Sequence, residues 1–117
     1  MGKTINLYLD DLRDCPKGFI VARTFDQAVD LIERHTIDVL SLDHDLGSDE
    51  DGNLLPTGYD FVKKFCEEGH FANKIYIHTD NVIGRENMYE TLLAAQRRGF
   101  ISKEIEIYRH PHYWRKN

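Results

Sequence analysis

The chain has 117 residues, of which 41% are hydrophobic and 30% are charged, and its formal net charge is -5. This size is typical of one globular domain, here residues 1–117, that folds without a disulfide framework or a structural metal. The acidic balance excludes a protein that coats duplex nucleic acid, and no apolar run reaches the roughly 20 residues that cross a membrane. Because residues 1–6 lack the pattern of a secretory signal, we expect the protein in the cytoplasm.

The amino-terminal half of the chain alternates short apolar runs with turn residues. Two runs predict strands over residues 5–9 and 19–23, with a proline and a glycine in the loop between them. A capping-box spacing then predicts an amphipathic helix over about residues 24–35. The strand that follows, over residues 38–43, has the continuous apolar run of a strand that is buried on both faces.

The carboxyl-terminal half continues the same alternation. An acidic loop over residues 47–56 leads into a helix over about residues 57–68, and a strand follows over residues 74–78. A third helix runs from about residue 84 to a glycine at residue 99. The strict alternation of residues 104–108 predicts a half-exposed edge strand.

This order of elements predicts an α/β domain with a mostly parallel five-stranded sheet. Only about nine residues separate the first two strands, which is short for a parallel crossover that contains a full helix. Either the connecting helix is reduced to a turn, or the second strand is misplaced or antiparallel. The sequence leaves these possibilities open.

Aspartates follow two of the predicted strands, at the edge where open α/β sheets bind their ligands. Residues 1–83 contain 16 acidic and 8 basic side chains, whereas residues 84–117 contain 4 and 7. Asp10, Asp11 and Asp43 would repel one another at this edge unless a cation or a proton lay among them. We therefore expect them to bind Mg²⁺ or Mn²⁺, since these ions prefer hard oxygen ligands. The alternative for Asp10 and Asp11 is a solvated turn.

Two of the six histidines, His44 and His78, stand beside these carboxylates at neighbouring strand ends. A carboxylate orients an imidazole and favours its use in proton transfer. We interpret both histidines as candidate acid–base groups, with Asp45 orienting one of them or a metal-bound water. The alternative is a buried, hydrogen-bonded imidazole. His110 and His112 have the spacing of a zinc pair, but a partly exposed tail is the simpler interpretation.

The third helix begins soon after the fourth strand, and the amino termini of helices bind anions readily. Arg85 lies in its expected first turn and offers a bidentate donor for a phosphate. Asn81 either caps this helix or bonds a phosphate oxygen. We expect the acidic loop over residues 47–56 to cover the mouth of such a site. The sequence lacks the glycine-rich motifs of P-loop and dinucleotide sites, which argues against those ligands.

The strand ends resemble those of a response-regulator receiver domain, whose flavodoxin-like sheet has the strand order 2-1-3-4-5. The resemblance implies Mg²⁺ binding by Asp10 and Asp11, phosphoryl acceptance by Asp43 and phosphate contact by Thr79.

The chain also differs from a receiver in three ways. The first helix is reduced or missing, and residues 109–117 cannot form the last helix. The receiver's lysine at the end of the fifth strand is absent as well, with Arg109 or His110 nearest to its place.

A narrower resemblance, to the cyclic-phosphate processing receiver-like family, rests on four motifs: LDDLR at residues 9–13, SLDHDLG at 41–47, TGYD at 57–60 and HTDNVIGRENM at 78–88. It implies a metal-assisted phosphoesterase that acts on a small cyclic nucleotide or on the 2′,3′-cyclic phosphate end of an RNA. In that enzyme the three aspartates would hold the metal and the two histidines would exchange protons. Thr79, Asn81 and Arg85 would bind the phosphate.

A different class of function stays open beside this enzyme. A non-catalytic phosphoacceptor or ligand-sensing module would keep the same acidic pocket, and a small accessory protein would dock through Tyr113 and Trp114. The mixed-sign charge suits a small ligand or a nucleic-acid end better than duplex nucleic acid or a membrane. The resemblance implies that this ligand is a small phosphorylated or cyclic-phosphate molecule, or an RNA end. The oligomeric state is left open.

Overall fold

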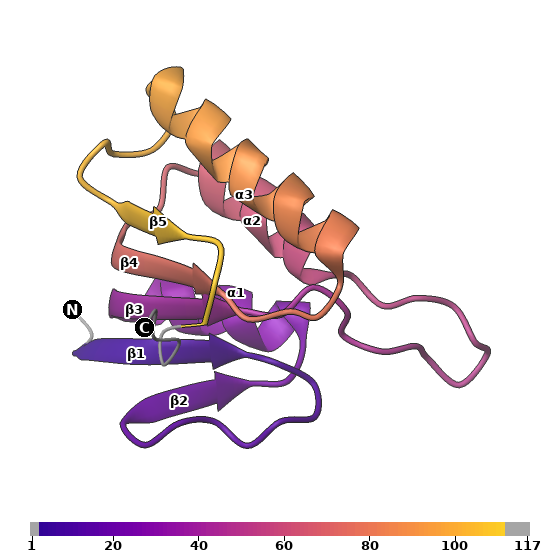
Figure 1. The fold of residues 1–117 in the computed structure, drawn as a ribbon. Coiled ribbons are helices and arrows are strands. Elements are labelled where there is room, and N and C mark those ends of the chain that lie inside the picture. Colours follow the sequence, from indigo (N-terminus) through magenta and orange to yellow (C-terminus); the bar gives the residue numbers. More distant parts are fainter. Residues whose placement is uncertain (1–2, 112–117) are drawn as a thin grey trace, which may run out of the picture.

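The structure of the chain is a computed structural model that describes residues 3–111. It contains five strands and three helices, and each helix joins two strands (Figure 1). In chain order they are β1 (Thr4–Leu9), β2 (Phe19–Ala22), α1 (Phe25–Arg34), β3 (Thr36–Leu42), α2 (Gly58–Glu67), β4 (Ala72–Ile77), α3 (Val82–Arg97) and β5 (Glu106–Tyr108). His112, Tyr113 and Trp114, which figure in the sequence-based hypotheses, lie outside the described residues.

The sheet has the strand order β2-β1-β3-β4-β5, and every neighbouring pair is parallel. This order confirms the predicted flavodoxin-like α/β fold. It also answers the question about the first two strands, because they are parallel and residues 10–18 join them through turns without a helix. The Arg23 guanidinium ties this connection by donating to the carbonyl oxygens of Asp10 at 3.3 Å and Arg13 at 2.7 Å.

All three helices cover the same face of the sheet (Figure 1). The crossovers that contain α1, α2 and α3 all move toward β5, and right-handed crossovers in one direction place their helices on one face. The connection from β1 to β2 runs the opposite way and would place a helix on the second face. It has none, so the first helix of a receiver is missing, as predicted. Residues 109–111, which follow β5, form no helix either.

The core lies between the sheet and these helices. Its largest fully buried side chains are Leu7, Leu9, Ile37, Leu40, Leu42, Ile75 and Ile77 from the strands, with Phe61, Val62, Phe65, Met88 and Leu92 from α2 and α3. Because alternate strand residues point to opposite faces, the side chains between these core positions lie on the face away from the helices. Within residues 3–111 no helix is both long and apolar enough to span a membrane.

Two element boundaries differ from the prediction. Helix α3 begins at Val82, before the predicted start at residue 84, because the Asn81 side chain caps it by accepting the Gly84 N–H at 2.8 Å. Strand β5 is shorter than predicted. The residues before it form a turn, in which the Gln96 side-chain amide donates to the carbonyl oxygens of Ser102 at 3.1 Å and Ile105 at 2.8 Å.

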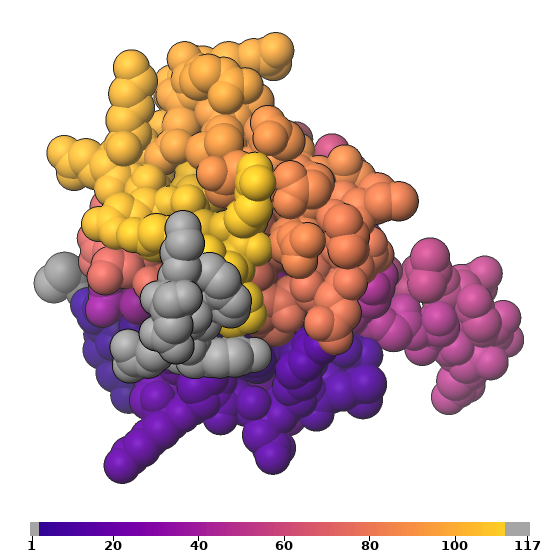
Figure 2. Space-filling view, in the orientation of Figure 1, coloured from indigo at the N-terminus to yellow at the C-terminus, as the bar shows by residue number. Residues whose placement is uncertain are grey.

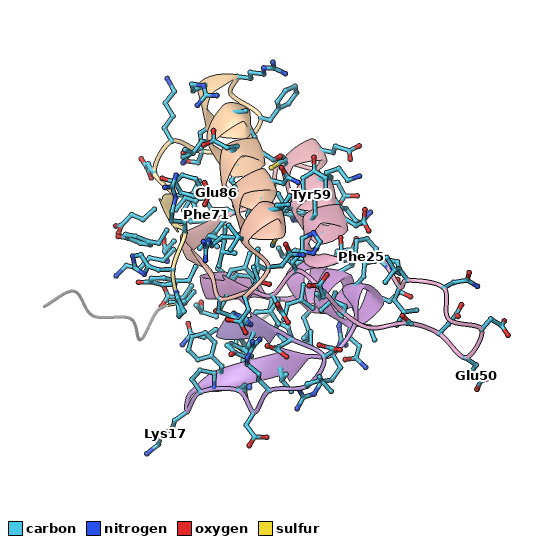
Figure 3. All side chains as sticks on the ribbon, turned by 45° about the vertical axis from the view of Figure 1, so that its right-hand side comes forward. Lys17, Phe25, Glu50, Tyr59, Phe71 and Glu86 are labelled. Atoms are coloured by element: carbon cyan, nitrogen blue, oxygen red, sulfur yellow. The ribbon has the colours of Figure 1, made fainter. Side chains whose placement is uncertain are left out.

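The acidic loop over residues 47–56 extends away from the body of the molecule, as Figures 1 and 2 show. Its two arms bond to each other: Ser48 and Leu54 form an antiparallel bridge, and the Leu55 N–H donates to the Gly47 carbonyl oxygen at 3.0 Å. Glu50 stands at the outer tip (Figure 3). The expectation that this loop covers the site is therefore wrong, because the arms are held by bonds within the loop and project outward.

Candidate active site

A pocket of about 400 Å³ opens at the carboxyl ends of β1, β3 and β4. We call it the carboxylate pocket, since acidic and polar side chains dominate its lining: Asp10, Asp11, Leu12, Arg13, Asp43, Asp45, Gly47, Thr79, Asp80 and Asn81. Most of the predicted site residues are among them. Three of the predicted residues, His44, His78 and Arg85, are not part of the lining.

Strand register brings Asp10, Asp43 and His78 together. The last residues of β1, β3 and β4 pair with one another, and each of these polar residues comes directly after one of them. The ladder continues for one more step, because the N–H groups of Asp43 and His78 each donate at 2.9 Å to a carbonyl oxygen at the end of the neighbouring strand. Since the last strand residues point into the core, the three side chains that follow share the opposite face.

Asp10 is fully buried, and its carboxylate accepts hydrogen bonds on both oxygens. Oδ1 accepts the N–H groups of Leu12 at 2.9 Å and Arg13 at 2.8 Å, while Oδ2 lies 2.8 Å from the Arg13 guanidinium and 3.0 Å from Nε2 of His78. Burial by itself raises the pKa of Asp10, but these hydrogen bonds outweigh it and hold the pKa below its usual range. Asp10 is therefore a carboxylate at neutral pH.

The negative charge of Asp43 is stabilised less completely by its neighbours than that of Asp10. Its Oδ1 accepts the His44 N–H at 2.8 Å, the Thr79 hydroxyl bonds to the same carboxylate, and the Arg13 guanidinium lies 3.4 Å from Oδ2. Burial is the largest influence and raises the pKa of Asp43, with a smaller contribution in the same direction from the charge of Asp10. A further cation at this point would stabilise its charged form.

The donor atoms at this edge fit a divalent metal ion. Asp10, Asp43 and His78 each offer a ligand atom within 4.8 Å of the other two. Among residues 3–111 they form the one cluster of acidic, histidine or cysteine side chains close enough to hold a metal ion. Asp11 faces the same pocket, and in the described part of the chain its carboxylate has no hydrogen bond or ion pair. Carboxylate oxygens are the ligands that Mg²⁺ and Mn²⁺ prefer, so the residues present suit the predicted ions.

His78 lies beneath the pocket, with its side chain only 1% exposed. Nε2 is 3.0 Å from Oδ2 of Asp10, and Nδ1 is 2.7 Å from Oγ of Ser41. The ring also stacks on Tyr8, with 4.2 Å between the ring centroids. These contacts match the alternative that the sequence left open, a buried and hydrogen-bonded imidazole, and they favour a positioning role toward Asp10.

His44 and Asp45 form a hydrogen-bonded pair at the wall of the pocket. Nδ1 of His44 lies 3.0 Å from Oδ1 of Asp45, and the Asn81 amide donates to the other oxygen at 3.3 Å. The bond to His44 is the main cause that lowers the pKa of Asp45. The imidazole packs against α3 so closely that a Cβ on Gly84 would lie 2.5 Å from its ring. Asp45 thus faces the pocket with the imidazole directly behind it.

The first turn of α2 fixes the chain between Asp43 and Asp45. Thr57 and Asp60 form a full capping box. The Gly58 N–H donates to the carbonyl oxygen of His44 at 2.7 Å, and a Cβ on Gly58 would lie 1.8 Å from the carbonyl oxygen of Asp43. Only a glycine allows the helix to approach this backbone so closely.

The predicted phosphate donors are placed unequally. Thr79 and Asn81 line the pocket, and Asn81 also caps α3, which is one of the two roles that the sequence left open. Arg85 lies outside the lining, with its Nε 3.6 Å from a carboxylate oxygen of Glu86. Arg109 lies over the Tyr89 ring, 4.3 Å from its centroid, and 3.5 Å from the other oxygen of Glu86.

The sequence-based interpretation assigned no role to Arg13, which provides the positive charge at the centre of the site. Nη1 lies 2.8 Å from Asp10 and 3.4 Å from Asp43, and Nη2 lies 3.0 Å from Asp80. The guanidinium therefore brings a positive charge from the first connection to within 3.4 Å of Asp43. The available signal was its spacing, three residues after Asp10 in a turn.

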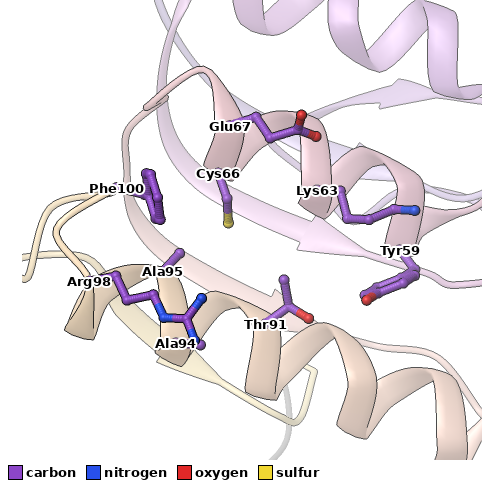
Figure 4. Close-up of a pocket in the computed structure, with 9 residues that line it drawn as sticks. All are labelled: Tyr59, Lys63, Cys66, Glu67, Thr91, Ala94, Ala95, Arg98 and Phe100. Carbon is purple, nitrogen blue, oxygen red and sulfur yellow. The ribbon is translucent and has the colours of Figure 1, made fainter.

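A second pocket, of about 410 Å³, lies between α2 and α3 (Figure 4). We call it the α2–α3 pocket; its lining consists of Tyr59, Lys63, Cys66, Glu67, Thr91, Ala94, Ala95, Arg98 and Phe100. The Cys66 thiol is buried there, and burial raises its pKa to about 11. In residues 3–111 no ion pair joins the charged side chains of this lining, so they do not form a convergent polar group.

The family comparison agrees with this geometry. A family model described as "Cyclic-phosphate processing Receiver domain" matches residues 5–94, which include every residue that lines the carboxylate pocket. Searches of curated proteins and of solved structures find no significant match.

Proposed function

Because the chain belongs to the family of cyclic-phosphate processing receiver domains, we propose that it is a metal-assisted phosphoesterase that opens a cyclic phosphodiester. The observation that carries this proposal is the convergence of donor atoms from Asp10, Asp43 and His78, all within 4.8 Å of one another, at the carboxylate pocket. A non-catalytic receiver would need the acidic cluster but not the His44–Asp45 pair beside it.

Asp10, Asp11 and Asp43 would hold Mg²⁺ or Mn²⁺. When bound, such an ion neutralises the negative charge that develops on the phosphoryl oxygens during displacement. His78 keeps the Asp10 carboxylate in position from below, and Thr79 does the same for Asp43 through its hydroxyl. The chain thus prepares the carboxylates on a rigid sheet edge before any ligand arrives.

The His44–Asp45 pair is placed to move the protons of the reaction. A water oxygen attacks phosphorus while the pair takes one of its protons, and one ester bond from phosphorus to a ring oxygen breaks. The oxygen that leaves takes up a proton from the pair and becomes a hydroxyl, so the product is a linear phosphomonoester. Asp45 faces the pocket, and the imidazole behind it shares the proton through their hydrogen bond.

A small cyclic nucleotide or the 2′,3′-cyclic phosphate end of an RNA would be the substrate. The pocket volume of about 400 Å³ lies in the range of roughly 300–1,000 Å³ that is typical of sites for such ligands. The Asn81 side chain lines this pocket and would provide an N–H donor for a phosphate oxygen. The Thr79 hydroxyl lines it too, and would donate to phosphate only by giving up its hydrogen bond to Asp43. A duplex would not reach the buried carboxylates.

A panel of cyclic and linear phosphates, assayed with Mg²⁺, with Mn²⁺ and with a chelator, tests the proposal. We expect metal-dependent opening of a cyclic substrate that is lost in Asp43→Asn and strongly reduced in His44→Ala. His70→Ala is the matched control, because this histidine pairs with Glu68 at the carboxyl end of α2, whereas the first turn of α2 adjoins the site. A stable, base-labile adduct on Asp43 after incubation with acetyl phosphate, without any turnover, would instead identify a receiver-type phosphoacceptor.

A further inference from the structure

The Arg13 guanidinium lies among three carboxylates, where a positive charge reduces the repulsion between them. Nη1 contacts Asp10 and Asp43 at 2.8 and 3.4 Å, and Nη2 contacts Asp80 at 3.0 Å. We propose that Arg13 is the internal cation of the metal-free site, and that a divalent ion displaces it from Asp10 and Asp43. The inference rests on the metal-binding part of the proposed function, and not on turnover.

Competition follows from the distances. A Mg²⁺ ion lies about 2.0–2.1 Å from its oxygen ligands. The same oxygens of Asp10 and Asp43 that would serve as ligands already lie within 3.4 Å of Nη1. A guanidinium nitrogen in that position would stand against the ion and repel it. Metal binding therefore requires the side chain of Arg13 to move outward.

The surroundings of Arg13 allow this movement without loss of the turn. Its backbone is fixed at both ends, because its N–H donates to Oδ1 of Asp10 at 2.8 Å and its carbonyl oxygen accepts the Arg23 guanidinium at 2.7 Å. Its side chain, in contrast, is 40% exposed, and its outer partner Asp80 is 95% exposed. The guanidinium can leave the two inner carboxylates and keep its contact with Asp80 at the mouth.

The released guanidinium would stay in the same pocket as Thr79 and Asn81. There it would offer a bidentate donor for a phosphate, which Arg85 does not offer from its position outside the lining. Metal binding and phosphate binding would thus support each other, and by linkage the effect is reciprocal. Arg13 is in this sense a positioning residue that changes its partner when the metal arrives.

Calorimetric titration with Mn²⁺ alone tests the competition. We expect Arg13→Gln to bind Mn²⁺ about tenfold more tightly than the wild type, because the ion no longer has to displace a cation. Arg13→Lys should show a smaller gain, since an ammonium cannot bridge three carboxylates. Arg34→Gln is the matched control: it also removes one positive charge, but from an exposed pair with Asp30. Its Mn²⁺ affinity should equal that of the wild type.

Titration with inorganic phosphate forms the second arm. Saturating Mn²⁺ should raise the phosphate affinity of both proteins, because the ion itself attracts the anion, and the increase should be about tenfold larger in the wild type than in Arg13→Gln. Unchanged or weaker Mn²⁺ affinity in both Arg13 variants would overturn the inference, and Arg13→Lys keeps this outcome accessible should Arg13→Gln fold poorly. If neither the wild type nor the variants bind Mn²⁺, the metal-binding part of the proposed function fails together with it. If the wild type and both Arg13 variants bind Mn²⁺ with the same high affinity, the competition between Arg13 and the metal is refuted and the metal-binding part of the proposed function stands.

Discussion

Two of the pockets in residues 3–111 have nearly equal volumes, about 400 Å³ at the sheet edge and about 410 Å³ between α2 and α3. In the carboxylate pocket, polar side chains leave three adjacent strands in register and bond to one another. In the α2–α3 pocket, the charged side chains come from two helix surfaces and do not meet. The comparison shows that the convergence of polar groups, and not the volume, sets the carboxylate pocket apart as the candidate site.

The largest expected effect comes from Gly58→Ala, which would displace the backbone that carries Asp43 in the carboxylate pocket. The new Cβ would lie 1.8 Å from the Asp43 carbonyl oxygen, and neither backbone segment can yield without moving α2 or β3. We expect the free energy of unfolding to fall by about 3 kcal/mol or more, as measured by urea denaturation. Gly52→Ala, at a loop position with open space around it, should cost only about 1 kcal/mol despite its positive φ.

Gly84→Ala would sharpen the comparison, because it changes the carboxylate pocket without unfolding the protein. Its Cβ meets the His44 imidazole at 2.5 Å, and that side chain can rotate away. We expect turnover of the cyclic substrate to fall about a hundredfold, since small displacements of a catalytic group are costly. Stability should change little, because the helix propensity of alanine offsets the cost of displacing the His44 ring.

The control for this variant is Thr91→Ala, on the same helix but in the lining of the α2–α3 pocket. Its turnover should match the wild type. Full turnover in Gly84→Ala would show that the position of His44 does not matter for the reaction.

A change in the α2–α3 pocket should affect the free energy of unfolding at high pH and leave the turnover of the substrate unchanged. Burial raises the pKa of the Cys66 thiol from 9.0 to about 11, so above pH 9 the unfolded chain loses this proton while the folded chain keeps it. The free energy of unfolding therefore falls as the pH rises from about 9 to about 11, by about 2 kcal/mol relative to Cys66→Ala. Urea denaturation of both proteins across this window measures the difference. Cys15→Ala should keep the decline, and all three proteins should turn over the substrate equally.

The smallest effect is expected from the helix caps. Thr57 and Thr24 each cap a helix by accepting a backbone N–H, so Thr57→Ala and Thr24→Ala should each lower stability by about 1 kcal/mol. Only Thr57 holds the helix that bonds to the His44 carbonyl oxygen. Steady-state kinetics should therefore show lower turnover in Thr57→Ala alone. An equal loss of turnover in the two variants would mean that the cap of α2 does not support the carboxylate pocket.

The fold and the acidic centre could be predicted from the sequence because the local residue pattern marks where each strand ends. Apolar runs that stop at Asp10 and Asp43 locate the carboxyl edge of a parallel sheet, and that edge is where ligands bind. The burial of His78 was accessible too, although the interpretation left it open. Ile75 and Ile77 point into the core, so the alternation of the strand directs His78 to the same face as the carboxylates.

The residue pattern only hinted at the placements of Arg13 and Arg85, because each depends on how the backbone turns after a strand. Arg13 reaches three carboxylates only because a turn without a helix follows β1. Arg85 was predicted at the amino terminus of a helix, but the Asn81 cap starts α3 at Val82. Arg85 then stands one turn inside the helix, where its own N–H is bonded to the Asn81 carbonyl oxygen at 2.8 Å.

The loop over residues 47–56 has a use that follows from its self-contained bonds. Because its arms close on each other at Ser48 and Leu54, a reporter peptide or a fluorescent label inserted beside Glu50 would begin and end at the same place. Such an insertion would leave the strands before and after it undisturbed. The projection therefore offers an attachment point for a label at a tip that lies outside the lining of the carboxylate pocket.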